Sequence, residues 1–274
     1  MIHRNRREMM VLLAAVSLVL LAVVTIAGAN VYGDAMVTDF SRKNLPPCLE
    51  YPFGTDFMGR DMFVRTIAGL SVSIRLGLVT AAFSAVIAFF MGLAAAVLGK
   101  TADGLVSGLI DLMMGIPHIL LLILISFACG KGFWGVVIGI SMTHWTSLAR
   151  LIRGEVLQLR ESNYMKIAAR LGHGKLRTAM VHMTPHLLPQ FITGLVLLFP
   201  HAILHEASIT FLGFGLSPEE PAIGVILSES MKYLVTGEWW LAVFPGVLLV
   251  GVVLLFHILG QGVLLILDPE RAHE

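Results

Sequence analysis

Histidine is the residue of this chain best suited to binding a ligand, and its placement is unusual. Five of the ten histidines fall in stretches apolar enough to lie in a membrane: His118, His144, His201, His205 and His257. Polar side chains are costly inside a bilayer and often line a pathway. An isolated histidine there can equally well hydrogen-bond a neighbouring helix, and for a single residue we favour that structural interpretation.

The pair His201 and His205 is more specific. Residues four positions apart share one face of a helix. Two imidazoles placed in this way can hold a borderline metal ion such as Ni²⁺ or Zn²⁺. The pair therefore predicts either a metal pathway or two contacts that hold helices together.

No residues suited to covalent catalysis accompany the histidines. Gly99-Lys100-Thr101 looks like the end of a phosphate-binding loop, but the glycine required five residues earlier is replaced by Ala94. The glycine shapes the phosphate cradle, and no strand is expected before this segment. We therefore expect a non-enzymatic chain with no ATPase site and no bound cofactor of its own.

The two cysteines, Cys48 and Cys129, are too few for a disulfide-built scaffold. Both fall in segments expected outside the cytoplasm, where an oxidising compartment would permit a bridge. Their pairing stays open at this point.

Composition places the chain in the membrane. Of its 274 residues 57% are hydrophobic and only 14% are charged, whereas a soluble domain carries about 25% charged residues. A helix crosses the hydrocarbon core with about 20 apolar residues, and several stretches are that long. The net charge of +1 gives no indication of a nucleic-acid partner.

These stretches predict an all-α integral membrane protein with six transmembrane helices and one domain over residues 1–274. The expected order is a first helix at about 9–31, an outer loop at 32–70, three helices within 71–149 (the third of the six, about 105–128, containing Pro117), an inner loop at 150–188, and two helices within 190–267.

Positive charge sets the expected orientation. If the N-terminus lies inside, twelve Lys and Arg residues fall on inner segments and six on outer ones. We therefore expect a multi-pass membrane protein with both termini in the cytoplasm.

The 150–188 loop has the pattern of a short helix–turn–helix in the cytosol. A helix-forming run (YMKIAAR) ends at a Gly-His-Gly break beginning at Gly172, and a second short run follows before Pro185. Glycine permits the positive φ angles of a tight turn, and small Ala168 and Ala169 let a partner surface come near. An ordinary amphipathic loop would look similar.

Several motifs resemble those of one family. Tyr164–Gly172 resembles the EAA loop of ABC importer permeases, although Lys166-Ile167-Ala168 stands where the family has Glu-Ala-Ala. Residues 54–61 (GTDFMGRD) and 206–215 (EASITFLGFG) resemble two signatures of the peptide/nickel permease family. Phe244-Pro245-Gly246 and Leu267-Asp268-Pro269 also match, so the resemblance covers about residues 50–270.

The resemblance implies a type I ABC importer permease fold, a place in the inner membrane of a bacterial cell, and a set of partners. The chain would pair with a second, different permease, two cytoplasmic ATPase subunits and an extracytoplasmic substrate-binding protein, in contact with membrane lipid and not with nucleic acid. Ala168, Ala169, Arg170 and Gly172 would couple it to the ATPases.

The histidines resemble more closely the nickel-transporter branch, in which a similar His-x-x-x-His occurs. They imply passage of Ni²⁺ or a nickel chelate past His201 and His205. The alternatives are a di- or oligopeptide permease and, more remotely, an ion channel or a secondary carrier. Gly135 and Gly139 add a GxxxG pair, which either allows close helix packing or is merely tolerated.

Overall fold

The structure is a computed structural model that describes residues 2–163, 165, 167 and 174–267. Within these residues all regular secondary structure is helical, and the only β feature is one isolated bridge between Thr55 and Asp61. This confirms the expected all-α class. In chain order the elements are α1 (Ile2–Asn30), η1 (Asp34–Met36), η2 (Phe40–Arg42), α2 (Met62–Val97), α3 (Lys100–Gly115), α4 (His118–Ala128), α5 (Gly132–Glu161), α7 (Lys175–Thr178), η3 (Ala179–Met183), α8 (Thr184–Phe211), α9 (Ile223–Met231) and α10 (Trp240–Leu267).

Membrane-spanning length and hydropathy occur in four helical segments of the described chain, or five if the bent pair α3–α4 counts as one span. The four are Arg7–Asn30, Met62–Val97, Ala179–Phe211 and Trp240–Leu267. With α5, which is 30 residues long but more polar, six long helical segments match the expected order. Many large apolar side chains on these helices are exposed, including Leu12, Ile26 and Leu254, as expected of helices that face lipid or a partner subunit.

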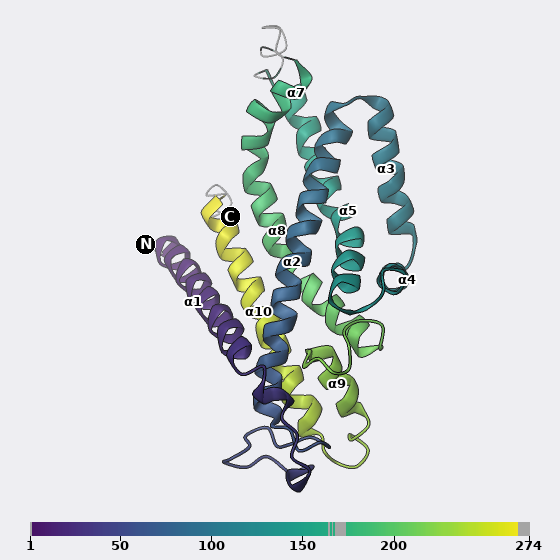
Figure 1. Cartoon of the computed structure of the whole chain (residues 1–274). Helices are drawn as coiled ribbons and strands as arrows, with labels where there is room; N and C mark the ends of the chain where they lie inside the picture. Colours follow the sequence, from purple (N-terminus) through teal and green to yellow (C-terminus); the bar gives the residue numbers. More distant parts are fainter. Residues whose placement is uncertain (1, 164, 166, 168–173, 268–274) are drawn as a thin grey trace.

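Two ends of the molecule can be distinguished in Figure 1. At one end lie η1, η2 and α9, and at the other lies α7. α1 begins, and α10 ends, toward the α7 end, so the two terminal helices run antiparallel and pack against each other. Both termini of the membrane region therefore lie on one side, in agreement with an even number of crossings.

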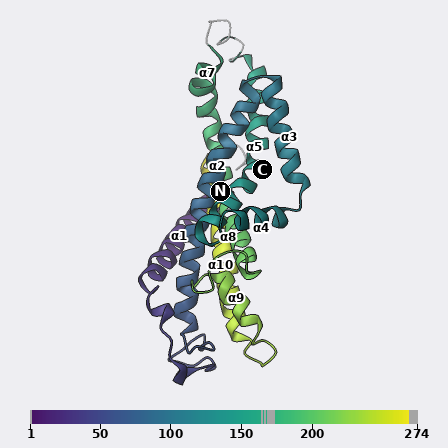
Figure 2. The same ribbon diagram turned by 45° about the vertical axis from the view of Figure 1, so that its right-hand side comes forward.

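The single helix expected at 105–128 is divided into two, because α3 and α4 meet at an angle of 100°. Pro117 causes the break. A residue before proline is disfavoured in the helical region, and Ile116 is accordingly extended (φ −92°, ψ 137°), which ends α3 at Gly115. Figure 2 shows α4 lying across the molecule about midway between its ends.

Two further boundaries differ from the sequence prediction. α2 begins at Met62, well inside the region expected as outer loop, because Asp61 accepts hydrogen bonds from the backbone N–H groups of Phe63 and Val64 and so caps the helix. α5 continues to Glu161, beyond the expected end of that span at 149. Both extensions carry polar residues, which lower the local hydropathy.

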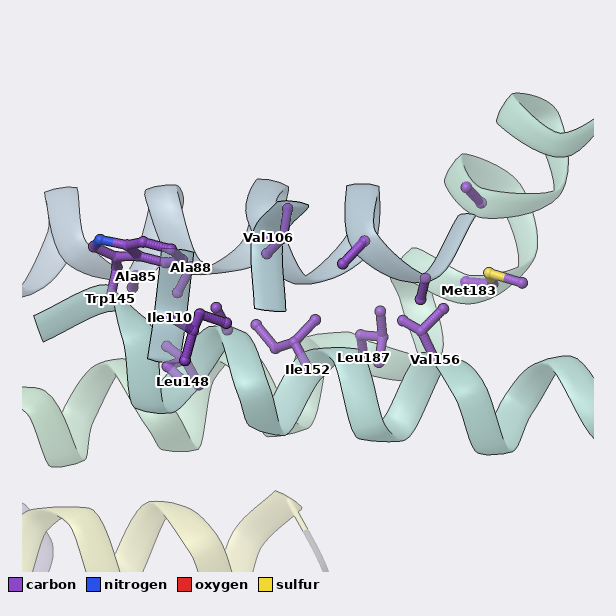
Figure 3. Packing of buried hydrophobic residues seen from close by; sticks show 14 of the residues in the cluster. Ala85, Ala88, Val106, Ile110, Trp145, Leu148, Ile152, Val156, Met183 and Leu187 are labelled. Atoms are coloured by element: carbon purple, nitrogen blue, oxygen red, sulfur yellow. The ribbon is translucent and has the colours of Figure 1, made fainter. Parts of the chain in front are cut away.

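Three clusters of buried apolar residues hold the helices together. The cluster in Figure 3 joins α2, α3, α5, η3 and α8 through residues such as Ala88, Ile110, Trp145, Ile152 and Leu187. The second cluster joins α2 to α8, α9 and α10. The third joins α2 to α4, α5 and α8. Because α2 takes part in all three, it is the central helix of the fold.

The GxxxG pair brings α4 close to α5. A Cβ at Gly135 would lie 2.9 Å from the carbonyl oxygen of Ser126, and a Cβ at Gly139 would lie 3.2 Å from that of Leu122. Of the two interpretations left open by the sequence, the structure supports close helix packing, and the neighbouring helix is α4.

Candidate functional site

A cavity of about 580 Å³ opens beside the break between α3 and α4. Irregular backbone within a membrane protein is tolerated where it is buried in protein or lines a cavity, and substrate sites of transporters commonly form at such broken helices. The cavity is lined by residues from α3, α4, α5 and α8, among them Met113, Met114, Thr143, Thr146 and Ser147. Its lining is thus apolar with a few hydroxyl groups, apart from its histidines.

Three histidines meet at this cavity from three different helices. His118 is the first residue of α4, His144 lies in the middle of α5, and His205 lies in α8. Their ring centroids are 4.8 Å apart for His118 and His144, 4.6 Å for His118 and His205, and 4.9 Å for His144 and His205. One ring nitrogen of each lies within 4.8 Å of those of the other two. We call these three residues the histidine triad.

The position of His144 is fixed by its own helix. Its Nδ1 lies 3.0 Å from the carbonyl oxygen of Ile140 and 3.2 Å from Oγ1 of Thr143. A carbonyl can only accept a hydrogen bond, so Nδ1 carries the hydrogen and Nε2 holds the free electron pair. The side chain is only 9% exposed, and Nε2 has no hydrogen-bond partner within the described chain.

The two histidines of the predicted pair, His201 and His205, have different surroundings in the structure. His205 belongs to the triad, while His201 lines the same cavity but is exposed and lies outside the group of close ligand atoms. The pairing of His205 with His118 and His144 could not be read from spacing along one helix. The clue in the sequence was Pro117, which places His118 at a helix start. His257 is exposed on α10 and does not line this cavity.

The residues predicted to couple the chain to its ATPases, Ala168, Ala169, Arg170 and Gly172, lie outside the described residues. The elements on either side of them are described. α5 ends at Glu161 and α7 begins at Lys175, and both lie at the same end of the molecule (Figure 1). The coupling role therefore stays a prediction.

A buried ion network explains the GTDFMGRD motif at the other end. Asp56 Oδ2 lies 2.6 Å from Nε of Arg60 and 3.0 Å from Nη1 of Arg65. Glu229 of α9 completes it, with Oε2 2.7 Å from Arg65 and 3.3 Å from Arg60. The network ties the segment before α2 to α9. Sequence reasoning missed Arg65 and Glu229, which stand outside the motif.

The EASITFLGFG segment forms the end of α8 and the turn that follows. Thr210 Oγ1 donates a hydrogen bond of 3.0 Å to the fully buried carboxylate of Glu206 and accepts one of 3.2 Å from the backbone N–H of Leu216. Gly213 follows the end of the helix with φ +83°, a conformation that glycine adopts without strain. These residues shape the chain at the α8 end and do not line the histidine cavity.

Cys48 and Cys129 are both free and exposed in the structure. They come from different parts of the chain, before α2 and at the end of α4. The structure therefore contains two separate thiols, with no disulfide between Cys48 and Cys129.

Long apolar helices that surround a cavity lined by a few polar side chains are the architecture of a membrane transport protein. Residues 84–273 match the family described as the binding-protein-dependent transport system inner membrane component. Because this match covers more than half of the sequence, the chain belongs to that family, the permeases of ABC importers, and is a multi-pass protein of the inner membrane.

Comparison with curated proteins gives relatives along nearly the whole chain. A putative peptide transport system permease of Brucella abortus is 35% identical over 99% of this chain and 90% of its own length. The dipeptide permease DppC of Bacillus subtilis is 30% identical over 84% of this chain and 72% of its own length. A probable D,D-dipeptide permease of Escherichia coli is 30% identical over 86% and 79%.

These three names refer to peptides, so they give no support to the nickel branch that the histidine motifs resembled. Among solved structures, an inward-facing form of the MetNI methionine ABC transporter has a TM-score of 0.61 over 76% of this chain and 98% of that one, at 18% identity. This likeness supports the type I permease fold and nothing finer.

Proposed function

We propose that this chain is a permease subunit of an ATP-driven importer of short peptides. The observation that carries the proposal is the 35% identity, over almost the entire sequence, to a relative named for peptide transport. The cavity beside the α3–α4 break agrees with it, because about 580 Å³ is within the usual range of small-molecule sites.

In this proposal the chain does not act alone. It pairs with a second permease, receives its substrate from an extracytoplasmic binding protein and is driven by two ATPase subunits. Ala168, Ala169, Arg170 and Gly172 contact the ATPases, and both termini lie in the cytoplasm. The positions of α5 and α7 on either side of this segment, at the end away from α9, support the assignment.

A nickel ion or nickel chelate is the second candidate substrate. The observation that favours it is the gathering of His118, His144, His201 and His205 around a single cavity, since imidazole is a common ligand of nickel. Membership of the importer family leaves no reason to retain the channel or secondary-carrier alternative.

Transport by the complete importer distinguishes the two substrates. Proteoliposomes containing both permeases and the ATPases would be supplied with ATP and the binding protein, then offered a radiolabelled dipeptide or radioactive Ni²⁺. We expect saturable dipeptide uptake that stops when an ATPase variant unable to hydrolyse ATP is used. Uptake of nickel without uptake of any peptide would overturn the proposal in favour of the second candidate.

A further inference from the structure

We propose that the histidine triad is a binding site for a divalent metal ion of borderline softness, such as Co²⁺, Ni²⁺ or Zn²⁺. His118, His144 and His205 come from three separate helices, yet each offers a ring nitrogen within 4.8 Å of the others. Packing alone does not require three imidazoles at one point, and no Asp, Glu or Cys belongs to the group in the described chain.

The unpaired ring nitrogens of the triad make the strongest argument. Nε2 of His144 and Nε2 of His118 are both buried, and neither has a hydrogen-bond partner among the described residues. Leaving a buried polar atom without a hydrogen-bond partner is costly. The Ile140 carbonyl fixes Nδ1 of His144 as the protonated nitrogen, which is how metal-binding histidines are commonly oriented. The ring thus presents a ligand atom that the protein itself does not use.

The geometry requires a small closure. Two imidazole nitrogens bound to one tetrahedral metal ion at 2.0–2.1 Å lie about 3.3 Å apart, whereas the triad nitrogens are spread over as much as 4.8 Å. Rotation of His118 and His205, which are only half-buried beside the cavity, can close this gap. His144, held by Ile140, would stay in place.

The donor set determines the class of metal. Nitrogen ligands suit Zn²⁺, Ni²⁺, Co²⁺ and Cu²⁺, whereas Mg²⁺ and Ca²⁺ prefer oxygen. Three protein ligands leave at least one coordination position open to the cavity, which is the arrangement of an accessible site rather than of a closed structural one. His201 and the thioethers of Met113 and Met114 line the same cavity and are available as further contacts.

Metal binding at the triad goes beyond peptide import and does not depend on it. If peptides are the cargo, the ion is a component of the site or arrives bound to the peptide. If nickel is the cargo, the three triad histidines are its ligands within this chain. Binding is measured without transport, so the inference and the proposed function can fail separately.

Visible absorption of Co²⁺ tests the inference on the importer purified in lipid nanodiscs. Co²⁺ bound by imidazoles at low coordination number gives d–d bands that the hydrated ion lacks. We expect saturable bands, and about tenfold or greater loss of affinity in each of the variants His144→Gln and His205→Gln. Glutamine keeps the size and polarity of the side chain, and unchanged elution and thermal melting without metal would show that the variants fold.

The control variant is His257→Ala, which removes an exposed histidine on a membrane helix away from the cavity, and we expect wild-type affinity from it. Titration with Co²⁺ alone and with a pre-formed Co²⁺–dipeptide complex distinguishes binding of the ion from binding of a complex, and saturation in either arm supports the site. Absence of saturable bands in both arms, or equal Co²⁺ affinity in wild type and the two triad variants, would overturn it.

Discussion

At the scale of single residues, Asp56 organises the end of the protein that contains α9. Its carboxylate contacts Arg60 and Arg65 and also accepts hydrogen bonds from the backbone N–H groups of Met58 and Arg60. Arg65 is only 1% exposed and shares its charge with Glu229. Charges buried in this way are stable only as a set, because each one is costly without its partners.

Arg65→Met should therefore destabilise the protein strongly. It leaves the buried Asp56 and the partly exposed Glu229 with one cation fewer, and removal of one partner from a buried pair costs about 3–5 kcal/mol. Thermal unfolding of the detergent-purified protein measures the effect. Arg150→Met is the matched control, because its pair with Asp111 is largely exposed (52% and 72%) and is worth about 0–1 kcal/mol. Equal melting temperatures for the two variants would contradict this account.

The histidines show how much of the candidate site can be predicted from residue patterns. Their presence in apolar stretches indicated a polar site within the membrane, and the structure places both His201 and His205 at one cavity. The partners of His205 could not be deduced, because His118 and His144 lie on other helices and a period of 3.6 residues describes only one helix at a time. The same holds for Arg65 and Glu229, which meet only when α9 folds back beside α2.

At the scale of elements, the sequence predicted long apolar helices well and their polar ends poorly. Hydropathy located the middle of each long helix. It missed the first turns of α2, where Arg65 and Thr66 are polar but buried, and the last three turns of α5. The bend at Pro117 was missed because hydropathy alone does not show where a helix breaks, whereas here Ile116 leaves the helical conformation completely.

The contact between α4 and α5 depends on Gly135. Gly154, in the same helix α5, makes no such contact and serves as the comparison. Gly135→Ala should destabilise the protein by about 1–3 kcal/mol, because its Cβ would lie 2.9 Å from the Ser126 carbonyl oxygen. Gly154→Ala should have no effect or stabilise by up to about 1 kcal/mol, since nothing lies within 4 Å of the added methyl group and alanine favours the helix. Thermal melting of both variants tests the opposite signs, and a stabilising Gly135→Ala would show that the helices are not in close contact there.

At the scale of the whole molecule, the free thiol of Cys48 reports on orientation. With the termini in the cytoplasm, Cys48 precedes α2 on the outer side, whereas Cys129 follows α4, which lies about midway between the ends of the molecule. A membrane-impermeant maleimide added to intact spheroplasts should label Cys48. The variant Cys129→Ser leaves Cys48 as the single thiol, and Cys48→Ser is the control that should lose the signal. Labelling of Cys48 only after the membrane is permeabilised would reverse the orientation and with it the assignment of the ATPase-facing loop.

The predicted coupling segment and the histidine triad are connected directly along the chain. α5 carries His144, α8 carries His205, and the predicted coupling segment lies in the chain between these two helices. A force that ATPase subunits exert on residues 168–172 would therefore act on the two helices that hold two of the three triad residues. This is the physical reason to expect that ATP hydrolysis changes the shape of the histidine cavity.

Gly172→Val tests this connection. If Gly172 forms a positive-φ turn against an ATPase, a β-branched side chain there should abolish most ATP-driven uptake, while insertion in the membrane and Co²⁺ binding at the triad are unchanged. Gly174→Val is the matched control, because Gly174 is exposed and nothing lies within 4 Å of an added Cβ. Uptake in proteoliposomes and co-purification of the ATPases measure the two aspects of coupling. Wild-type uptake by Gly172→Val would refute the role of this glycine, whereas equal loss in both variants would mean that the segment tolerates no bulk and that Gly172 has no special part in it.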